Sequence, residues 1–354
     1  MFRFARRYVL LPCAATLISS GSAWACASCG CSLSTDAATG YSSVPGWRVT
    51  LQFDYIDQDQ LRAGTGSVSP ATVAALNNPG GPGQEVEHET VNRYTTFSLS
   101  YRPTADYGFN LLVPYVDRNH TTYGEATPDL LTPDQLSGAT VKGLGDVRVI
   151  ANYQGFLSTH NAGIQFGIKL PTGNYGGPNA AGTGVVGRHP AVFTTGPNSQ
   201  APVPDNTLDT SLQAGTGTTD IIVGGYYYRA VSQDYDTFVN AQYQMAVAQK
   251  LDTPGEDFRP GDFAAVNTGL RYVANPQWVP QLQLNITHRN HDEGALADVG
   301  DSAGTAVYLS PGITANMAKV WQVYGFVQVP VYSRLSGYQL FPHWTASVGL
   351  SRGF

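Results

Sequence analysis

The sequence is poor in charge and has few long apolar runs. Only 13% of its 354 residues are Asp, Glu, Lys or Arg, which is about half of the usual share in soluble proteins. A soluble protein normally covers its surface with more charge. After the first 25 residues, no apolar run reaches the roughly 18 residues that a membrane-spanning helix needs. A protein that crosses a membrane with strands would explain both deficits.

Basic residues are the scarcer of the charged types. Residues 1–25 predict a secretory signal, with Arg3, Arg6 and Arg7 before an apolar stretch and a cleavage site after Ala25. Removal of this signal takes away three arginines and no acids, so that 17 basic and 26 acidic residues remain. That negative balance argues against nucleic acid as a partner, because nucleic-acid binding needs a basic surface.

Apolar and polar residues alternate with a period of two, which is typical of strands with two different faces. From Trp47 to Tyr55 the odd-numbered positions are apolar or aromatic, whereas Arg48, Thr50, Gln52 and Asp54 are polar. The same alternation returns in the last strand, between Trp344 and Ser351. A soluble β-sandwich also alternates, so the spacing of the strands must decide between the two folds.

The spacing predicts an all-β fold, a closed antiparallel transmembrane β-barrel of about twelve strands. Each predicted strand is long enough to cross a bilayer at a tilt, and the connections alternate between short turns and long loops. An even strand number places both termini on the short-turn side, which is periplasmic in such barrels. The predicted strands are 47–58, 89–102, 107–120, 144–156, 162–171, 218–231, 235–249, 262–274, 278–290, 305–316, 320–333 and 342–354.

The predicted organisation is therefore a signal peptide at 1–25, a periplasmic Cys-containing segment at 26–46, and a transmembrane barrel at 47–354. The segment at 26–46 could hang in the periplasm or fold into the lumen as a plug. The expected location is the bacterial outer membrane, in contact with its lipid. The terminal Phe354 resembles the aromatic residue that the barrel-assembly machinery recognises, although Arg352 stands where that signal usually has another aromatic residue.

Eight charged residues within the predicted strands fall on the polar face, which should be the lumen. A charge on the lipid face at mid-membrane would cost about 2–4 kcal/mol. Inside the barrel, charges of both signs could select a solute or form structural ion pairs, and the sequence leaves both roles open. The predicted lumen-lining residues are Asp54, Arg102, Arg118, Asp146, Arg148, Lys169, Arg271 and Arg289.

Several short motifs resemble a family of outer-membrane barrels that is associated with the meta-cleavage pathway of phenol degradation. They are Gly143-Leu144-Gly145-Asp146, Lys169-Leu170-Pro171-Thr172-Gly173, Leu212-Gln213-Ala214-Gly215-Thr216-Gly217 before Asp220, Val113-Pro114-Tyr115 and Leu309-Ser310-Pro311-Gly312. The resemblance covers roughly residues 90–354. It implies a channel or transporter for small, often aromatic or hydrophobic compounds.

Three cysteines follow the predicted cleavage site. Cys26, Cys29 and Cys31 could form a disulfide in the oxidising periplasm and leave one thiol for a partner protein. They could instead hold a metal ion through three thiolates, and lipidation or no role are further alternatives. No other cofactor is predicted. A haem is excluded because Gly30 occupies the position where the attachment motif needs its histidine.

The sequence predicts a non-enzymatic channel or transporter that passes small solutes through a polar lumen. Twelve-stranded barrels include a phospholipase, but its serine and histidine motif does not occur here, and Thr287-His288-Arg289 has no serine beside it. His288, His291, Asp292 and Glu293 could bind a cation, although a solvated loop is the simpler interpretation. The alternative function is a barrel that anchors a periplasmic redox or metal-handling partner on Cys26, Cys29 and Cys31.

Overall fold

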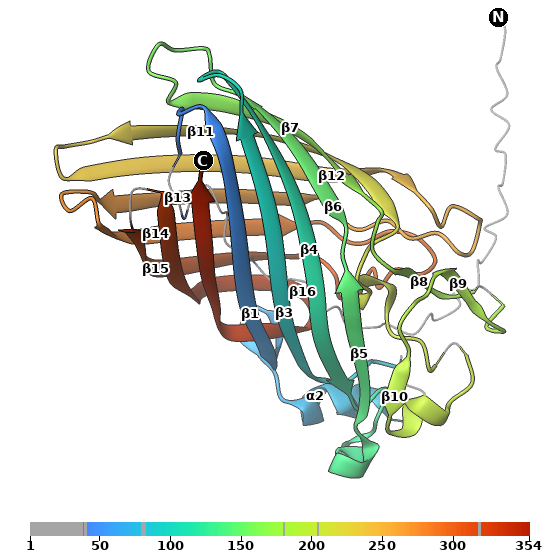
Figure 1. The fold of residues 1–354 in the computed structure, drawn as a ribbon. Helices are drawn as coiled ribbons and strands as arrows, with labels where there is room; N and C mark the ends of the chain where they lie inside the picture. Colours follow the sequence, from blue (N-terminus) through green and yellow to red (C-terminus); the bar gives the residue numbers. More distant parts are fainter. Residues whose placement is uncertain (1–37, 39–40, 79–82, 180, 204, 318–319) are drawn as a thin grey trace, which may run out of the picture.

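The chain forms one closed antiparallel β-barrel in a computed structural model (Figure 1). The structure describes residues 38, 41–78, 83–179, 181–203, 205–317 and 320–354. Each wall strand pairs with its neighbours in the sheet, and the ring closes where β4 (Tyr107–Thr122) pairs with β6 (Val147–Tyr153). Closure satisfies the backbone hydrogen bonds of the wall, which is the condition for strands to cross a membrane.

Twelve passes of the chain build the described wall, in agreement with the number that the spacing of the strands predicts. This number treats β5 (Ser137–Leu144) and β6 as one interrupted strand, because both pair with β4. It treats β16 (Trp321–Gly353) as two arms, because residues 321–335 pair with β15 and residues 339–353 pair with β1. The other wall strands are β1 (Gly46–Gly64), β3 (Glu87–Arg102), β7 (Ala162–Leu170), β11 (Thr218–Ala230), β12 (Tyr235–Gln249), β13 (Phe263–Tyr272), β14 (Trp278–Arg289) and β15 (Gly304–Met317).

The two faces of each strand follow the predicted alternation, with polar residues on one face and apolar residues on the other. In β1, Thr50, Gln52 and Asp54 are buried inside the barrel, whereas Leu51 and Phe53 are exposed on its outside. The strand at 218–230, which is apolar on both faces in the sequence, also has a defined register, with Asp220, Ile222 and Tyr226 turned inward. An exterior of exposed apolar side chains around a polar interior is typical of a barrel in lipid.

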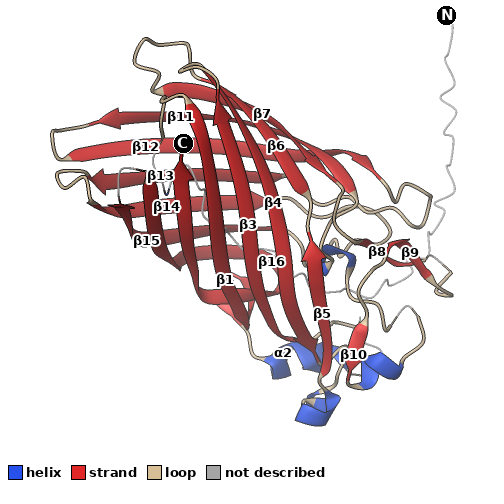
Figure 2. Ribbon diagram, viewed as in Figure 1, coloured by secondary structure: helices blue, strands red, loops and turns tan. Residues whose placement is uncertain are grey.

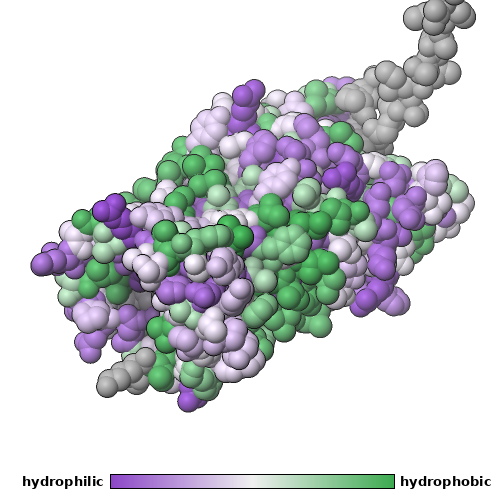
Figure 3. Space-filling model, turned by 90° about the horizontal axis from the view of Figure 1, so that it is seen from above, coloured by the Kyte–Doolittle hydropathy of each residue, from purple (hydrophilic) through white to green (hydrophobic). Residues whose placement is uncertain are grey.

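Aromatic side chains mark two rims of the apolar exterior. At the short-turn end Trp47 stacks on Tyr101 with ring centroids 4.2 Å apart, and eight residues further along β1 Tyr55 contacts Trp344 at 5.7 Å. Eight residues of a strand span about 27 Å, or about 20 Å along the axis at the tilt of such barrels. Figure 3 shows hydrophobic residues gathered on the wall and bordered by more hydrophilic ones. No described helix is long and apolar enough to span a membrane.

The long loops fold together at the opposite end of the barrel (Figure 2). Leu61, Val73, Phe193, Leu208 and Leu340 belong to an apolar core that joins several of these loops to the upper barrel wall. The long-loop end also contains these short elements: β2 (Gly66–Ser67), α2 (Pro70–Ala74), η1 (Ala75–Asn77), η2 (Pro128–Leu130), η3 (Pro133–Gln135), β8 (Tyr175–Pro178), β9 (Val185–Arg188), β10 (Phe193–Thr195), η4 (Pro197–Gln200) and η5 (Thr210–Leu212).

The predicted strand at 144–156 corresponds to the shorter β6, and the structure adds β5 just before it, at 137–144, where no strand was predicted. The two strands are separate because Gly145 and Asp146 turn inward, which interrupts the ladder. β5 then continues along β4 into the long-loop end and places Ala139 and Val141 in the apolar core. Apolar residues therefore face inward here, opposite to the rule within the membrane, because they contact loops rather than water.

The chain just before β1 lies inside the short-turn end of the barrel. Ala38 is fully buried, and its carbonyl oxygen accepts hydrogen bonds from Gln281 Nε2 at 3.0 Å and Thr314 Oγ1 at 2.8 Å. Tyr41 stacks on Tyr226, an inward-facing residue of β11. The described part of this segment, Ala38 and residues 41–45, thus crosses the lumen between the walls formed by β14–β15 and β11.

Candidate functional site

The middle of the barrel encloses a cavity of about 420 Å³. Most strands of the surrounding wall contribute polar side chains, among them Gln52, Ser98, Gln165, Asn240 and Asn267, whereas β16 contributes the apolar Leu335 and Phe341. The volume lies within the range of about 300–1,000 Å³ that small-molecule sites commonly occupy. The cavity therefore has room for a small solute.

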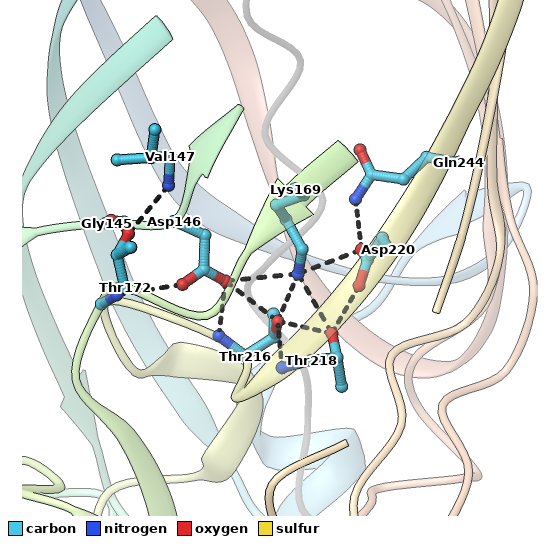
Figure 4. A network of polar contacts seen from close by, with 10 residues as sticks. Gly145, Asp146, Val147, Lys169, Thr172, Thr216, Thr218, Asp220 and Gln244 are labelled. Carbon is cyan, nitrogen blue, oxygen red and sulfur yellow. Dashed lines mark hydrogen bonds and ion pairs between the residues drawn. The ribbon is translucent and has the colours of Figure 1, made fainter. Parts of the chain in front are cut away.

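A buried lysine between two aspartates forms the strongest polar cluster of this cavity (Figure 4). Lys169 Nζ lies 3.2 Å from Asp146 Oδ2 and 3.0 Å from Asp220 Oδ2, and its side chain is only 3% exposed. It also donates to the hydroxyls of Thr216 and Thr218. A buried ammonium needs this degree of compensation, since its transfer from water costs several kcal/mol.

Four segments of the chain place this cluster. Lys169 lies next to the end of β7 and Asp220 lies near the start of β11, and the two residues face each other directly in the register of these strands. Asp146 reaches the lysine because the ladder is interrupted between β5 and β6, and it also accepts the backbone N–H groups of Gly173 and Thr216. Gln244 of β12 completes the cluster with a 2.6 Å hydrogen bond to Asp220. Asp220, Thr216, Thr218 and Gln244 were not among the predicted lumen-lining residues.

Arg118 and Asp54 are also held by neutral groups inside the barrel. Arg118 donates to Asn92 Oδ1 and to the Tyr94 hydroxyl, both at 2.6 Å, and to the carbonyl oxygen of Leu212. Asp54 accepts from Gln52 Nε2 at 3.0 Å and from the Ser347 hydroxyl at 2.5 Å. These bonds fix both charges at the cavity wall, where Arg118 also ties β4 to the loop before β11.

Arg148 and Arg289 line the cavity as well. Among the described residues the Arg148 guanidinium forms no hydrogen bond or ion pair, whereas Lys169 is fully occupied by its partners. A guanidinium in a cavity offers up to five donors to an incoming anion or polar group. Arg148 is thus the cation of this cavity best placed to contact a solute.

The two other predicted lining residues lie near the short-turn end and not among the residues that line the cavity. Arg271, at the end of β13, pairs with Asp236 at 3.3 Å. Arg102, at the end of β3, donates to the carbonyl oxygen of Ala105 at 3.3 Å. The structure therefore brings six of the eight predicted residues to the cavity and separates these two from it.

Several oxygens inside the barrel have no hydrogen-bond partner within the described part of the chain. Ser98 Oγ, Gln165 Oε1 and Asn240 Oδ1 are such buried oxygens, and all three residues line the cavity. Buried polar atoms almost always have a partner, whether protein, water or ligand. These oxygens are therefore available to water or to a polar solute in the cavity.

The lumen below the cavity is rich in aromatic rings. Tyr226 and Phe238 face it from β11 and β12, and Tyr324 and Phe326 face it from the first arm of β16. Glycines on adjacent strands make room for these rings. A Cβ at Gly269, for example, would lie 2.7 Å from the Phe238 ring, which is closer than real Cβ contacts. The residues that narrow this end of the barrel are thus flat and mostly apolar.

Acidic residues gather in the long loops above the cavity. Burial, together with the nearby carboxylates of Asp209, Asp301 and Glu85, raises the pKa of Asp298 to about 10. Burial raises the pKa of Asp209 to about 7, and Glu85 contributes in the same direction. At neutral pH Asp298 therefore keeps its proton.

Neither predicted metal site gains support from the described residues. Cys26, Cys29 and Cys31 lie outside them. His288 bonds to Thr305, while Asp292 accepts from the backbone of Gly261. Within the described ranges no three His, Cys, Asp or Glu side chains are arranged to hold a metal ion.

Comparison with solved structures identifies the architecture. The chain is similar to the COG4313 outer membrane channel from Pseudomonas putida F1, with a TM-score of 0.60 and 11% sequence identity over 91% of this chain and 100% of that one. The fold is that of an outer-membrane β-barrel. The toluene transporter TbuX of Ralstonia pickettii is similar at a TM-score of 0.41, with 10% identity over 88% of this chain and 90% of that one. No protein-family model and no curated protein sequence matches the chain.

Proposed function

We propose that this protein is an outer-membrane channel for small solutes, and that aromatic compounds with polar substituents are among them. One observation carries the proposal: a cavity of about 420 Å³, lined by both polar and apolar side chains, inside a closed barrel with an apolar exterior. The Arg148 guanidinium could bind a carboxylate or phenolate group, and the aromatic rings below could receive the flat part of the solute. The predicted lining residues inside this cavity would position the solute.

Conductance across a planar bilayer tests this proposal. The segment before β1 crosses the lumen, so the protein is compared with a Gln281→Leu/Thr314→Val variant that lacks both side-chain hydrogen bonds to Ala38. We expect discrete current steps, and more frequent or longer openings in the variant, because its segment is held less firmly. A folded barrel that stays silent in both forms would refute an open pathway through the cavity.

We further propose that the short-turn end faces the periplasm, as in other barrels of this architecture. Labelling of whole cells with a membrane-impermeant maleimide tests the orientation in a background without native cysteines. Asp129→Cys, in the long-loop end, should react in intact cells. Asp234→Cys, in the tight turn between β11 and β12, should react only after the outer membrane is permeabilised. The reverse pattern would contradict this orientation.

The anchoring role on Cys26, Cys29 and Cys31 has no support from the described residues, because the docking segment lies outside them. The resemblance to the phenol meta-cleavage family likewise stays a prediction from sequence motifs. The anchoring role concerns a partner protein and the family resemblance concerns a metabolic pathway. Neither changes the proposed passage of solutes through the lumen.

A further inference from the structure

Tyr41 occupies a slot made of three aromatic rings in the barrel wall. Its ring centroid lies 4.8 Å from that of Tyr226 and 5.5 Å from that of Tyr228, with interplanar angles of 18° and 9°. Phe238 contacts it at 5.8 Å with a tilt of 52°. We call Tyr226, Tyr228 and Phe238 the aromatic clamp. Two nearly parallel faces and one tilted ring are the arrangement that a single flat ring prefers in aromatic contacts.

Each ring of the aromatic clamp has a contact with another part of the barrel wall. The Tyr226 hydroxyl donates to Gln154 Oε1 at 2.5 Å, and the Tyr228 hydroxyl donates to the carbonyl oxygen of His160 at 3.0 Å. Phe238 is buried against Gly269 of the adjacent strand. The slot should therefore keep its shape when Tyr41 leaves it.

The occupant belongs to a short segment whose described residues make a small number of bonds to the barrel. These are the two hydrogen bonds to Ala38, a long contact from Gln154 to the carbonyl oxygen of Ser42, at 3.5 Å, and a side-chain hydrogen bond between Ser43 and Tyr228. Residues 41–45 have no regular secondary structure. Exchange of Tyr41 for another ring would consequently release a small part of the molecule and leave the wall intact.

We propose that the aromatic clamp is a binding subsite for monocyclic phenolic solutes, and that Tyr41 is an internal ligand which such a solute displaces. The tyrosine side chain is itself a para-substituted phenol, so the slot already fits this chemical class. Displacement would free the segment that crosses the short-turn end and would couple arrival of the solute to opening of its exit. This inference rests on the proposed channel function and names the substrate class and the gate of the same pathway.

The test measures how fast a reporter thiol in the segment reacts. Ser42→Cys is introduced into the full chain with its native cysteines changed to serine, and the detergent-purified barrel is labelled with a bulky maleimide. The probe is p-cresol, which reproduces the tyrosine ring, and the matched control is 4-methylcyclohexanol, which has the same size without aromaticity. If the released state is a minor one of about 10% or less, saturating p-cresol should raise the labelling rate ~tenfold or more. The control alcohol should leave the rate unchanged.

Variants in the same reporter background separate binding from general loosening. Tyr41→Ala should label fast without p-cresol and gain nothing from it, whereas Tyr228→Leu should lose the response to p-cresol. Tyr227→Leu, which changes an adjacent ring that faces lipid, should respond like the unaltered reporter. Heat-modifiability on gels confirms that each variant is a folded barrel.

An unchanged labelling rate with p-cresol in the folded reporter would overturn the inference, and so would an equal effect of 4-methylcyclohexanol. Conductance of the Tyr41→Ala barrel separates this failure from failure of the channel itself. A conducting variant whose parent does not respond to p-cresol would leave the channel standing without the phenolic subsite. A silent, folded variant would remove the channel function, on which this inference also depends.

Discussion

Lys169 Nζ lies 3.0 Å from Asp220 Oδ2 in the interior of the barrel, where β7 and β11 pair. With Asp146 on its other side, the lysine joins the break between β5 and β6 to the start of β11. The cluster thus fixes the point at which the longest loop of the described chain, between β7 and β11, leaves the wall and returns to it. The charges of this cluster hold the wall and the loop in place around the cavity, whereas Arg148 remains available to solutes.

Removal of this lysine should destabilise the barrel strongly. Lys169→Met leaves Asp146 and Asp220 buried without their cation, and breaking a buried pair typically costs about 3–5 kcal/mol. Unfolding by urea in detergent measures the loss. Lys142→Met provides the control, because the Lys142 side chain is 57% exposed and its ion-pair partner within the described residues is the partly exposed Asp117.

A Lys169→Met/Asp220→Asn double variant should recover part of that loss, since one of the two uncompensated carboxylates is gone. If Lys169→Met were as stable as Lys142→Met, the cluster would not hold the wall together.

A new charge should destabilise the barrel when it is placed on the lipid face of a strand and should be tolerated on the lumen face. Val266→Arg puts a cation on the lipid face of β13 and should lower the free energy of unfolding by about 2–4 kcal/mol. Asn267→Arg, at the next residue, puts the same side chain into the cavity, where polar groups and water can accept it. Folding into lipid vesicles, followed by denaturant titration, compares the two. Equal losses would contradict the assignment of faces.

Much of this architecture could be predicted from the sequence because two simple constraints act on every strand. Lipid on one side and a polar lumen on the other impose a period of two, which places Leu51 and Asp54 on opposite faces as the structure shows. Tight turns alternate with long loops, which sets the number of passes. The lining charges within the strands follow from the same parity.

The sequence could not show how the loops and the N-terminal segment meet the barrel. Asp220 escaped prediction because its strand is apolar on both faces, so parity gave no register there. The inward apolar residues of β5 depend on loop contacts such as that of Ala139 with Phe193, which are distant along the chain. The position of Tyr41 depends on three rings from other strands. Such contacts arise from tertiary structure and leave no periodic signal.

Stability of the long-loop end should fall as the pH rises. The unfolded chain releases the protons of Asp298 and Asp209 near pH ~4, whereas the folded chain holds them up to a pKa of about 10 and about 7 respectively. The folded state therefore binds more protons over this window, and linkage makes its stability decline with pH. The full stability is present below about pH 4 and is progressively lost toward pH 10.

Asp298→Asn should flatten this profile, because the amide mimics the protonated acid at every pH. Hydrogen exchange of the loops between pH 5 and pH 9, corrected for the intrinsic rate, measures the effect. Asp129→Asn is the control, since Asp129 is an exposed loop acid whose pKa is lowered by its hydrogen bond to Thr127. A profile that Asp298→Asn leaves unchanged would show that this carboxyl does not hold its proton.

Arg148 should influence which ions pass. Arg148→Gln removes from the cavity wall a cation that forms no ion pair with the described residues, and should move the reversal potential in a salt gradient toward cation preference. Arg229→Gln, at an exposed position near the end of β11, should leave it unchanged. A shift of the same size in both variants would mean that the surface charge of the protein, and not the cavity, sets the preference.

The most direct measurement asks whether current passes through the cavity itself. Asn240→Cys places a thiol in the cavity and Val239→Cys places one on the lipid face of the same strand, each in a cysteine-free channel. During planar-bilayer recording, a charged, water-soluble methanethiosulfonate reagent should reduce the current of Asn240→Cys and leave that of Val239→Cys unchanged. Unreduced current through Asn240→Cys channels that mass spectrometry shows to be modified would contradict a solute pathway through this lumen.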